Sequence, residues 1–201
     1  MILRVVNGRI PPGMLESVRA ALERDYVPVA RRQPGLDRFL TAVRPTETGH
    51  QIALMTVWTD LESALAAYGG NLTAVRTIDG VGHGEILDDV EFYEVETGGV
   101  RLTGGTPRFL RLTAGTVRRG LDADIQRELR SRLKVLGPEV VDAYVGRRVK
   151  GSSVEIAFVS TWTDGAAGRR LDEPIWPDIS AQYDAFSIGV FDVLLEGFRD
   201  R

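Results

Sequence analysis

Few side chains in this sequence are of the types that titrate near neutral pH or react as thiols. The 201 residues include two histidines, His50 and His83, and no cysteine, which excludes thiolate nucleophiles, disulfides and cysteine-based zinc or iron–sulfur sites. His83 stands among alternating glycines at positions 80, 82 and 84, and an imidazole there could remove a phenolic proton at neutral pH. The alternative is a solvated loop histidine, and His50 falls in a predicted hairpin turn where no chemical role is expected.

Five further residues complete the candidate set. Asn7 interrupts an apolar strand pattern, and a buried amide needs hydrogen-bond partners, one of which could be a ligand oxygen. Trp58 ends another apolar run, so its indole either lines a pocket for a flat aromatic ligand or packs as a core residue. Tyr68 is a second candidate for handling a proton, and we group it with Leu54 and Arg76 as substrate-binding residues.

Composition and motifs exclude several other classes of function. The carboxylates Asp88, Asp89 and Glu91 follow a strand pattern typical of a solvated face, so no metal site is predicted. The glycine stretch does not lead from a strand into a helix and is no dinucleotide fingerprint. The net charge of −3, without a lysine and arginine stripe, argues against a nucleic-acid partner. No apolar run approaches the ~20 residues of a membrane span and no signal peptide is evident, so we expect a cytoplasmic protein.

The sequence contains the same unit twice. The triplet at 58–60, Trp-Thr-Asp, recurs at 162–164, and each copy ends an apolar run rich in β-branched residues. Likewise Ile-Leu-Arg-Val at 2–5 aligns with Phe-Leu-Arg-Leu at 109–112. The glycine- and threonine-rich stretch between the copies is typical of a linker. We therefore predict one unit over 1–97, a linker over 98–107 and a second, diverged unit over 108–201.

Hydrophobic patterning predicts the order β-α-β-β-α-β in each copy, which is the ferredoxin-like unit. In the first copy, strands are predicted at 2–10, at about 37–44, at 51–58 and at 86–95. The first helix follows strand 2–10 and ends at Pro34-Gly35, and its buried face is predicted to carry Leu15, Val18, Leu22, Tyr26 and Val29. The second helix follows strand 51–58 and begins with the capping box Thr59-Asp60-Leu61-Glu62. In the second copy, Gly165 and Gly168 weaken the second helix.

Strand 52–58 is apolar on both of its alternating sets, so both faces of its sheet must be covered. A single ferredoxin-like unit has helices on one face only. Two units placed sheet against sheet would cover the other face, and here the second unit is part of the same chain. In the second copy, Trp176, Tyr183 and Phe186 follow the weakened helix, and we expect them to fill the cavity of that copy rather than line a new one.

The strand that ends in Trp58, the polar pair after it and the helix beginning Leu61-Glu62-Ser63-Ala64 resemble the antibiotic biosynthesis monooxygenase family. Pro34-Gly35 followed by a strand bearing Phe39 fits the same pattern. The resemblance covers almost the whole chain as a tandem fusion. It implies the α+β class, with two tandem ferredoxin-like units forming an intrachain dimeric α+β barrel, as a monomeric pseudo-dimer or a homodimer of fused barrels.

The resemblance also implies a function, a cofactor-independent monooxygenase-like enzyme acting on an aromatic or polyketide-type small molecule. The deprotonated substrate would itself pass an electron to O₂. In this reading Asn7 orients the substrate oxygen, Trp58 stacks on the ring, and His83 or Tyr68 handles the proton.

Haem is the less favoured cofactor. The histidine of the haem-degrading members falls here at Ala67 or Tyr68, so no cofactor is predicted. Two alternatives stay open. One is a non-catalytic small-molecule or haem-binding barrel of the stress-response type, and the other is a structural barrel with a filled interior.

Overall fold

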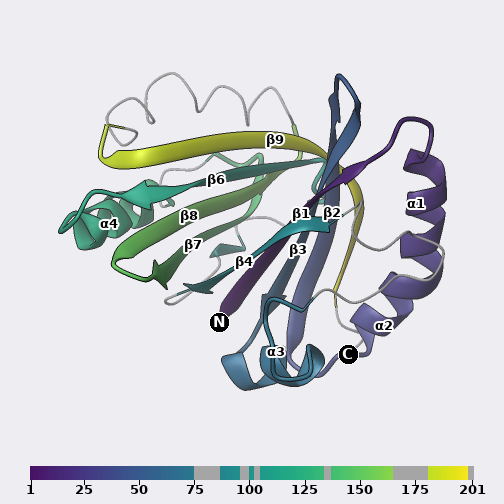
Figure 1. Cartoon of the computed structure of the whole chain (residues 1–201), viewed down its shortest axis with the longest axis horizontal. Helices are drawn as coiled ribbons and strands as arrows, with labels where there is room; N and C mark the ends of the chain where they lie inside the picture. The colour runs from purple at the N-terminus through teal and green to yellow at the C-terminus, as the bar shows by residue number, and fades with distance from the viewer. Residues whose placement is uncertain (75–86, 96–99, 102–104, 134–136, 165–180, 199–201) are drawn as a thin grey trace. The chain divides into compact units, whose positions relative to one another are not determined.

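A computed structural model describes residues 1–74, 87–95, 100–101, 105–133, 137–164 and 181–198 (Figure 1). The chain divides into two compact units, one made of Met1–Phe92 and Asp192–Arg201, the other of Tyr93–Phe191. This division differs from the predicted one, because the C-terminal residues group with the first copy of the repeat. The predicted linker also contains a two-residue strand, β5 (Val100–Arg101), which pairs with a strand of the second unit.

The sheet of the first unit has the strand order β4-β1-β3-β2-β9. Its strands are β1 (Ile2–Ile10), β2 (Leu36–Thr46), β3 (Gly49–Trp58), β4 (Leu87–Val95) and the second half of β9 (Tyr183–Phe198). The predicted strands of this copy are confirmed to within two residues. β3 lies between β1 and β2 and is antiparallel to both, so it forms the centre of the sheet.

The first helical segment runs as α1 (Leu15–Ala21), the π-helical turn η1 (Leu22–Tyr26) and α2 (Val27–Arg31). Pro28 explains the wide turn, because it has no backbone N–H and its ring would clash with the carbonyl of Arg24 in a regular helix. The N–H of Val27 instead donates to the carbonyl of Leu22, five residues back.

The π-helical turn corrects one predicted position. The extra residue in the turn rotates the helix that follows it, so the next buried residue is Ala30, at 4% exposed. Val29, which the periodicity predicts to be buried, is 44% exposed. Val18 and Leu22, which precede or begin the turn, are buried as predicted.

The helix α3 (Leu61–Ala67) is capped by Asp60. Its carboxylate accepts hydrogen bonds from the backbone N–H of Ser63 at 2.7 Å and from the Ser63 hydroxyl at 3.0 Å. The predicted capping pair of Thr59 and Glu62 is therefore corrected by one residue. The buried residues of α3 are Ala64 and Ala67, whereas Leu61, whose spacing with Leu65 and Tyr68 predicts one apolar face, is 45% exposed.

We expect Asp60→Ala to lower the Tm at neutral pH, because it removes the carboxylate that caps α3. Hydrogen bonds from the Ser63 backbone and then from Thr59 and Ser63 side chains lower the pKa of Asp60. The stabilisation is therefore fully present above the carboxyl's unfolded-state pKa and is lost as the pH falls through the lower folded-state pKa. Thermal unfolding curves of the two proteins should converge in strong acid.

The matched control is Asp60→Asn, which keeps an oxygen acceptor at the cap and should retain most of the Tm at neutral pH. A difference between Asp60→Ala and wild type that persists unchanged in strong acid would contradict the capping role.

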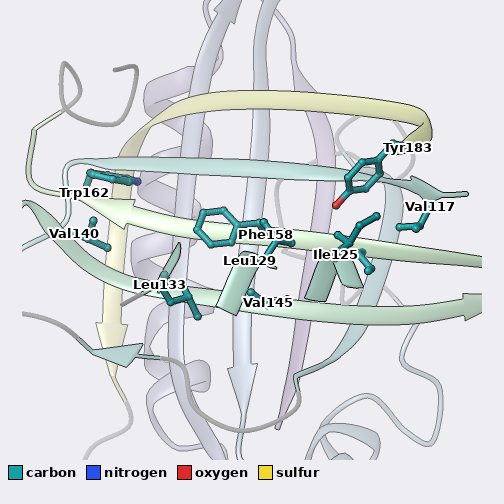
Figure 2. Packing of buried hydrophobic residues seen from close by; sticks show 11 residues of the cluster. Val117, Ile125, Leu129, Leu133, Val140, Val145, Phe158, Trp162 and Tyr183 are labelled. Carbon is teal, nitrogen blue, oxygen red and sulfur yellow. The ribbon is translucent and has the colours of Figure 1, made fainter. Parts of the chain in front are cut away.

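The second unit has the strand order β9-β6-β8-β7-β5, and the end of β4 also pairs with β7. Its elements are β6 (Phe109–Val117), α4 (Asp122–Leu133), β7 (Val140–Lys150), β8 (Ser153–Trp162) and the first half of β9. Figure 2 shows Ile125, Leu129 and Leu133 of α4 packed with Val145 and Phe158 of the sheet. The segment in which a second helix is predicted lies outside the described residues, so the complete repeat stays a prediction.

The structure belongs to the α+β class, with antiparallel strands and a few helices. Both alternating sets of β3 are buried, as its sequence predicts: Ile52, Leu54 and Trp58 on one face and Ala53, Met55 and Val57 on the other are each at most 7% exposed. Within the described parts of the chain, none of the helices has the length and apolar character needed to cross a membrane.

Candidate functional site

Strand register places four of the first unit's side chains on the sheet face that meets the helices. Arg4 pairs with Thr56 across β1 and β3, and neighbouring pairs join Ile2 to Trp58 and Val6 to Leu54. Directly paired residues point to the same face, and every second residue along a strand does so too. Arg4, Leu54, Thr56 and Trp58 therefore share the face that packs on Ala64 and Ala67 of α3 and on the first helical segment.

Asn7 lies on the opposite face of the same sheet. Asn7 pairs with Ala53, which is one residue from Leu54 and five from Trp58. Because successive side chains of a strand point to opposite faces, Asn7 and Ala53 point away from the face that carries Leu54 and Trp58. Asn7 and Trp58, which are predicted to contact the same substrate, therefore lie on opposite faces of the sheet. The sequence does not reveal this, because the pairing of strands that are separated by a helix and another strand cannot be read from a single sequence.

Trp58 is 1% exposed, and its indole N–H donates to the hydroxyl of Thr56 at 3.0 Å. The equivalent Trp162 of the second unit donates to Ser160 at 2.8 Å, so both copies satisfy the indole in the same way. Trp58 also meets the ring of Tyr68 edge to face, with centroids 5.7 Å apart. Trp58 is therefore held rigidly, with its polar atom occupied and its ring beside Tyr68.

Arg4 is the residue of this face that we did not predict as part of the site. It is 5% exposed, its Nε donates to the carbonyl of Leu72 at 2.8 Å, and its Nη2 donates to that of Ala74 at 2.6 Å. Its guanidinium carbon lies 4.0 Å from the centre of the Tyr68 ring. The signal was present in the sequence, since Arg4 is a charged residue in an apolar strand and aligns with Arg111 of the second copy.

No carboxylate in the described parts of the chain forms an ion pair with Arg4. Burial lowers the pKa of Arg4, while Tyr68 and Tyr26 oppose this effect, and a guanidinium stays protonated in any case. A buried cation is costly unless charge or hydrogen bonds compensate it. Two carbonyls and one aromatic face compensate Arg4 in part, and an anionic ligand would compensate it further.

The remaining predicted residues fall in different places. Leu54 is 7% exposed and lies further along the same face as Trp58. Arg76 and His83 lie outside the described residues, in the segment that begins directly after the carbonyl of Ala74 held by Arg4. His50 lies at the start of β3, ~26 Å along the strand from Trp58.

Within the described residues, no histidine lies beside Trp58 to act as the axial ligand of a haem, since His50 is at the far end of β3. A tyrosine can also bind haem iron, and Tyr68 meets Trp58 edge to face. Within the described ranges, no group of three histidine, aspartate or glutamate side chains is placed to hold a metal ion.

The second unit repeats part of this arrangement. Arg111, which is fully buried, pairs with Ser160 across β6 and β8, just as Arg4 pairs with Thr56. Tyr183 is 6% exposed within the hydrophobic core of this unit (Figure 2), and burial raises the pKa of its phenol. Trp176 and the side chain of Phe186 lie outside the described residues.

No protein-family model matches the chain, and no curated protein matches it at a significant level. Solved structures do share its fold. A candidate monooxygenase from Fusobacterium nucleatum matches with a TM-score of 0.69 and 12% identity over 98% of this chain and 94% of the other. A candidate monooxygenase from Lactobacillus acidophilus matches with a TM-score of 0.65 and 8% identity over 98% of this chain and 96% of the other.

An anthrone oxidase-like protein matches with a TM-score of 0.63 and 14% identity over 100% of this chain and 94% of the other. At these identities the likeness shows a shared fold. The chain therefore shares the fold of these three structures.

Proposed function

We propose that this protein is a cofactor-independent monooxygenase-like enzyme of the antibiotic biosynthesis monooxygenase type. Its substrate would be an aromatic or polyketide-type small molecule, bound between the helices and the sheet of the first unit. The observation that carries the proposal is Arg4, a buried guanidinium against the Tyr68 ring, which in turn meets Trp58 edge to face, with no carboxylate ion pair among the described residues. The fold shared with monooxygenase-like structures favours the same reaction class.

The proposed chemistry needs the protein to stabilise an anion. A base removes a proton from an activated CH₂ or phenol group, and the resulting enolate or phenolate passes an electron to O₂. Carbon–oxygen bond formation gives a peroxide, and cleavage of its O–O bond releases water, so that R₂CH₂ and O₂ become R₂C=O and H₂O. The Arg4 guanidinium would stabilise the substrate anion in a water-poor layer, where electrostatic interactions are strong.

Roles follow from position. Tyr68 and Trp58 would frame the aromatic ring of the substrate, and Leu54 would contact it further along the sheet. His83 stays our predicted base and Arg76 a predicted binding residue, both from the segment after Ala74. Asn7 has no place in this layer, because its side chain is on the other face of the sheet.

Oxygen uptake with 1,8-dihydroxyanthrone and a set of dihydroxynaphthalenes tests the proposal. We expect consumption of O₂ equimolar with the oxidised anthrone, and the anthraquinone as product, without added metal or cofactor. Uptake no faster than in buffer for every compound would refute the proposal. Titration with haemin tests the non-catalytic haem-binding alternative, since a shifted Soret band would favour it and an unshifted one would remove it.

A further inference from the structure

We infer that Thr41, beneath the π-helical turn of the first unit, is a specificity-determining residue that hydrogen-bonds a second oxygen of the substrate. The ligand would then carry two oxygen functions, an anionic one at Arg4 and a neutral one at Thr41, at opposite ends of a fused-ring system. This inference rests on the proposed function for the class of ligand, and it assigns a residue that the proposed mechanism does not use.

The first observation is the Thr41 hydroxyl itself. Thr41 is fully buried, and its Oγ1 has no hydrogen-bond partner among the described residues. A buried hydroxyl without a partner destabilises a fold, because its hydrogen bonds to water are lost and not replaced. A threonine at such a position therefore calls for a reason other than stability.

The second observation is where this hydroxyl lies. Thr41 pairs with Leu54 across β2 and β3, so it shares the helix-facing side of the sheet with Arg4 and Trp58. β1 and β2 flank β3, which puts the backbones of Arg4 and Thr41 roughly 10–12 Å apart. Two or three fused rings with an oxygen at each end can span that separation.

The third observation is the helix above this layer. The π-helical turn brings Tyr26 against Phe39, whose ring it meets edge to face with centroids 5.7 Å apart. Tyr26 packs with the hydrophobic clusters on both sides of Thr41, the one around Phe39 and the one around Val43, and it acts electrostatically on Arg4. Single π-helical turns occur frequently at functional sites.

The second unit supplies an internal comparison. Val145 pairs with Phe158 across β7 and β8, as Thr41 pairs with Leu54, so Val145 is the counterpart of Thr41. Val145 is 7% exposed and packs against α4, which runs from Asp122 to Leu133 as a regular α-helix. The same fold thus accepts the isosteric apolar residue here. The hydroxyl and the π-helical turn occur together in the first unit.

Thr41→Val tests the inference, because it removes the hydroxyl and keeps the shape. We expect the Tm to rise by about 2–4 °C, since an unsatisfied buried group is removed. Binding is measured by calorimetry under argon with 1,5-dihydroxynaphthalene and 1-naphthol. Wild type should bind the dihydroxy compound about tenfold more tightly than 1-naphthol, and Thr41→Val should lose that preference.

The matched control is Val145→Thr, which should lower the Tm and leave the preference between the two probes unchanged. A Thr41→Val protein that keeps the preference, or a wild type that shows none, overturns the inference. Because binding is measured without oxygen, the two proposals can fail separately. Absent oxygen uptake with a preference that depends on Thr41 refutes only the oxygenase, whereas uptake with a preference independent of Thr41 refutes only this inference.

Discussion

Arg4→Met is expected to lower kcat for oxidation of the anthrone by roughly 10²–10³-fold, the usual effect of removing one preorganised group that stabilises an anion. The substitution replaces a buried cation by an apolar side chain of similar length. The pKa of the bound substrate should then rise, because its anion loses the positive charge beside it. The pH–rate profile of any residual activity should accordingly move to higher pH.

Arg4 also holds the carbonyls of Leu72 and Ala74, so its loss has a structural effect that must be separated from the electrostatic one. Arg4→Lys retains the charge but not both hydrogen bonds, and it should keep the pH profile near that of wild type. Arg111→Met is the matched control in the second unit, where it should lower the Tm without lowering kcat. An Arg4→Met enzyme with the wild-type pH profile would show that Arg4 only positions the chain.

The sequence predicted the strands of the first unit well, because a strand buried on both faces has a strong apolar signal and clear turn residues at its ends. It predicted the helices less well. Pro28 lies inside an apolar helical pattern, and periodicity alone does not show that the chain passes it with a π-helical turn. The predicted cap of α3 differs from the observed one by one residue, because Thr59 and Asp60 are both good capping residues and the sequence alone does not choose between them.

The structure brings some of the predicted site residues together. Trp58, Leu54 and Tyr68 were chosen for their types and they do lie in one layer. Asn7 was also chosen for its type, but the face on which it lies depends on pairing between strands that are distant in sequence. In the sequence Arg4 is visible only as part of the repeat, where it aligns with Arg111. Its proposed role depends on its burial and on the lack of a carboxylate ion pair with it among the described residues.

The second large effect concerns stability. The C-terminal half of β9 joins the first unit through β2, where Arg38 pairs with Phe198 and Leu40 with Glu196. Arg38 is 1% exposed, and its Nη2 donates to the Glu196 carboxylate at 3.0 Å. Its guanidinium carbon also lies 5.0 Å from the centre of the Phe198 ring. Replacing Glu196 removes a charged partner of this buried guanidinium, which is costly.

We therefore expect Glu196→Leu to lower the free energy of unfolding by about 2–4 kcal/mol, somewhat less than for a fully buried pair, because the Glu196 side chain is 23% exposed. The double variant Arg38→Met/Glu196→Leu should recover most of this loss, since it removes both charges and their desolvation together. Urea unfolding of the three proteins gives the comparison. Asp184→Asn is the control, because Asp184 lies at the other end of β9 and forms an exposed ion pair with Arg118, whose loss should cost at most about 0.5 kcal/mol. A double variant as unstable as Glu196→Leu would mean that packing around Arg38, rather than its charge, holds the C-terminal half of β9 on β2.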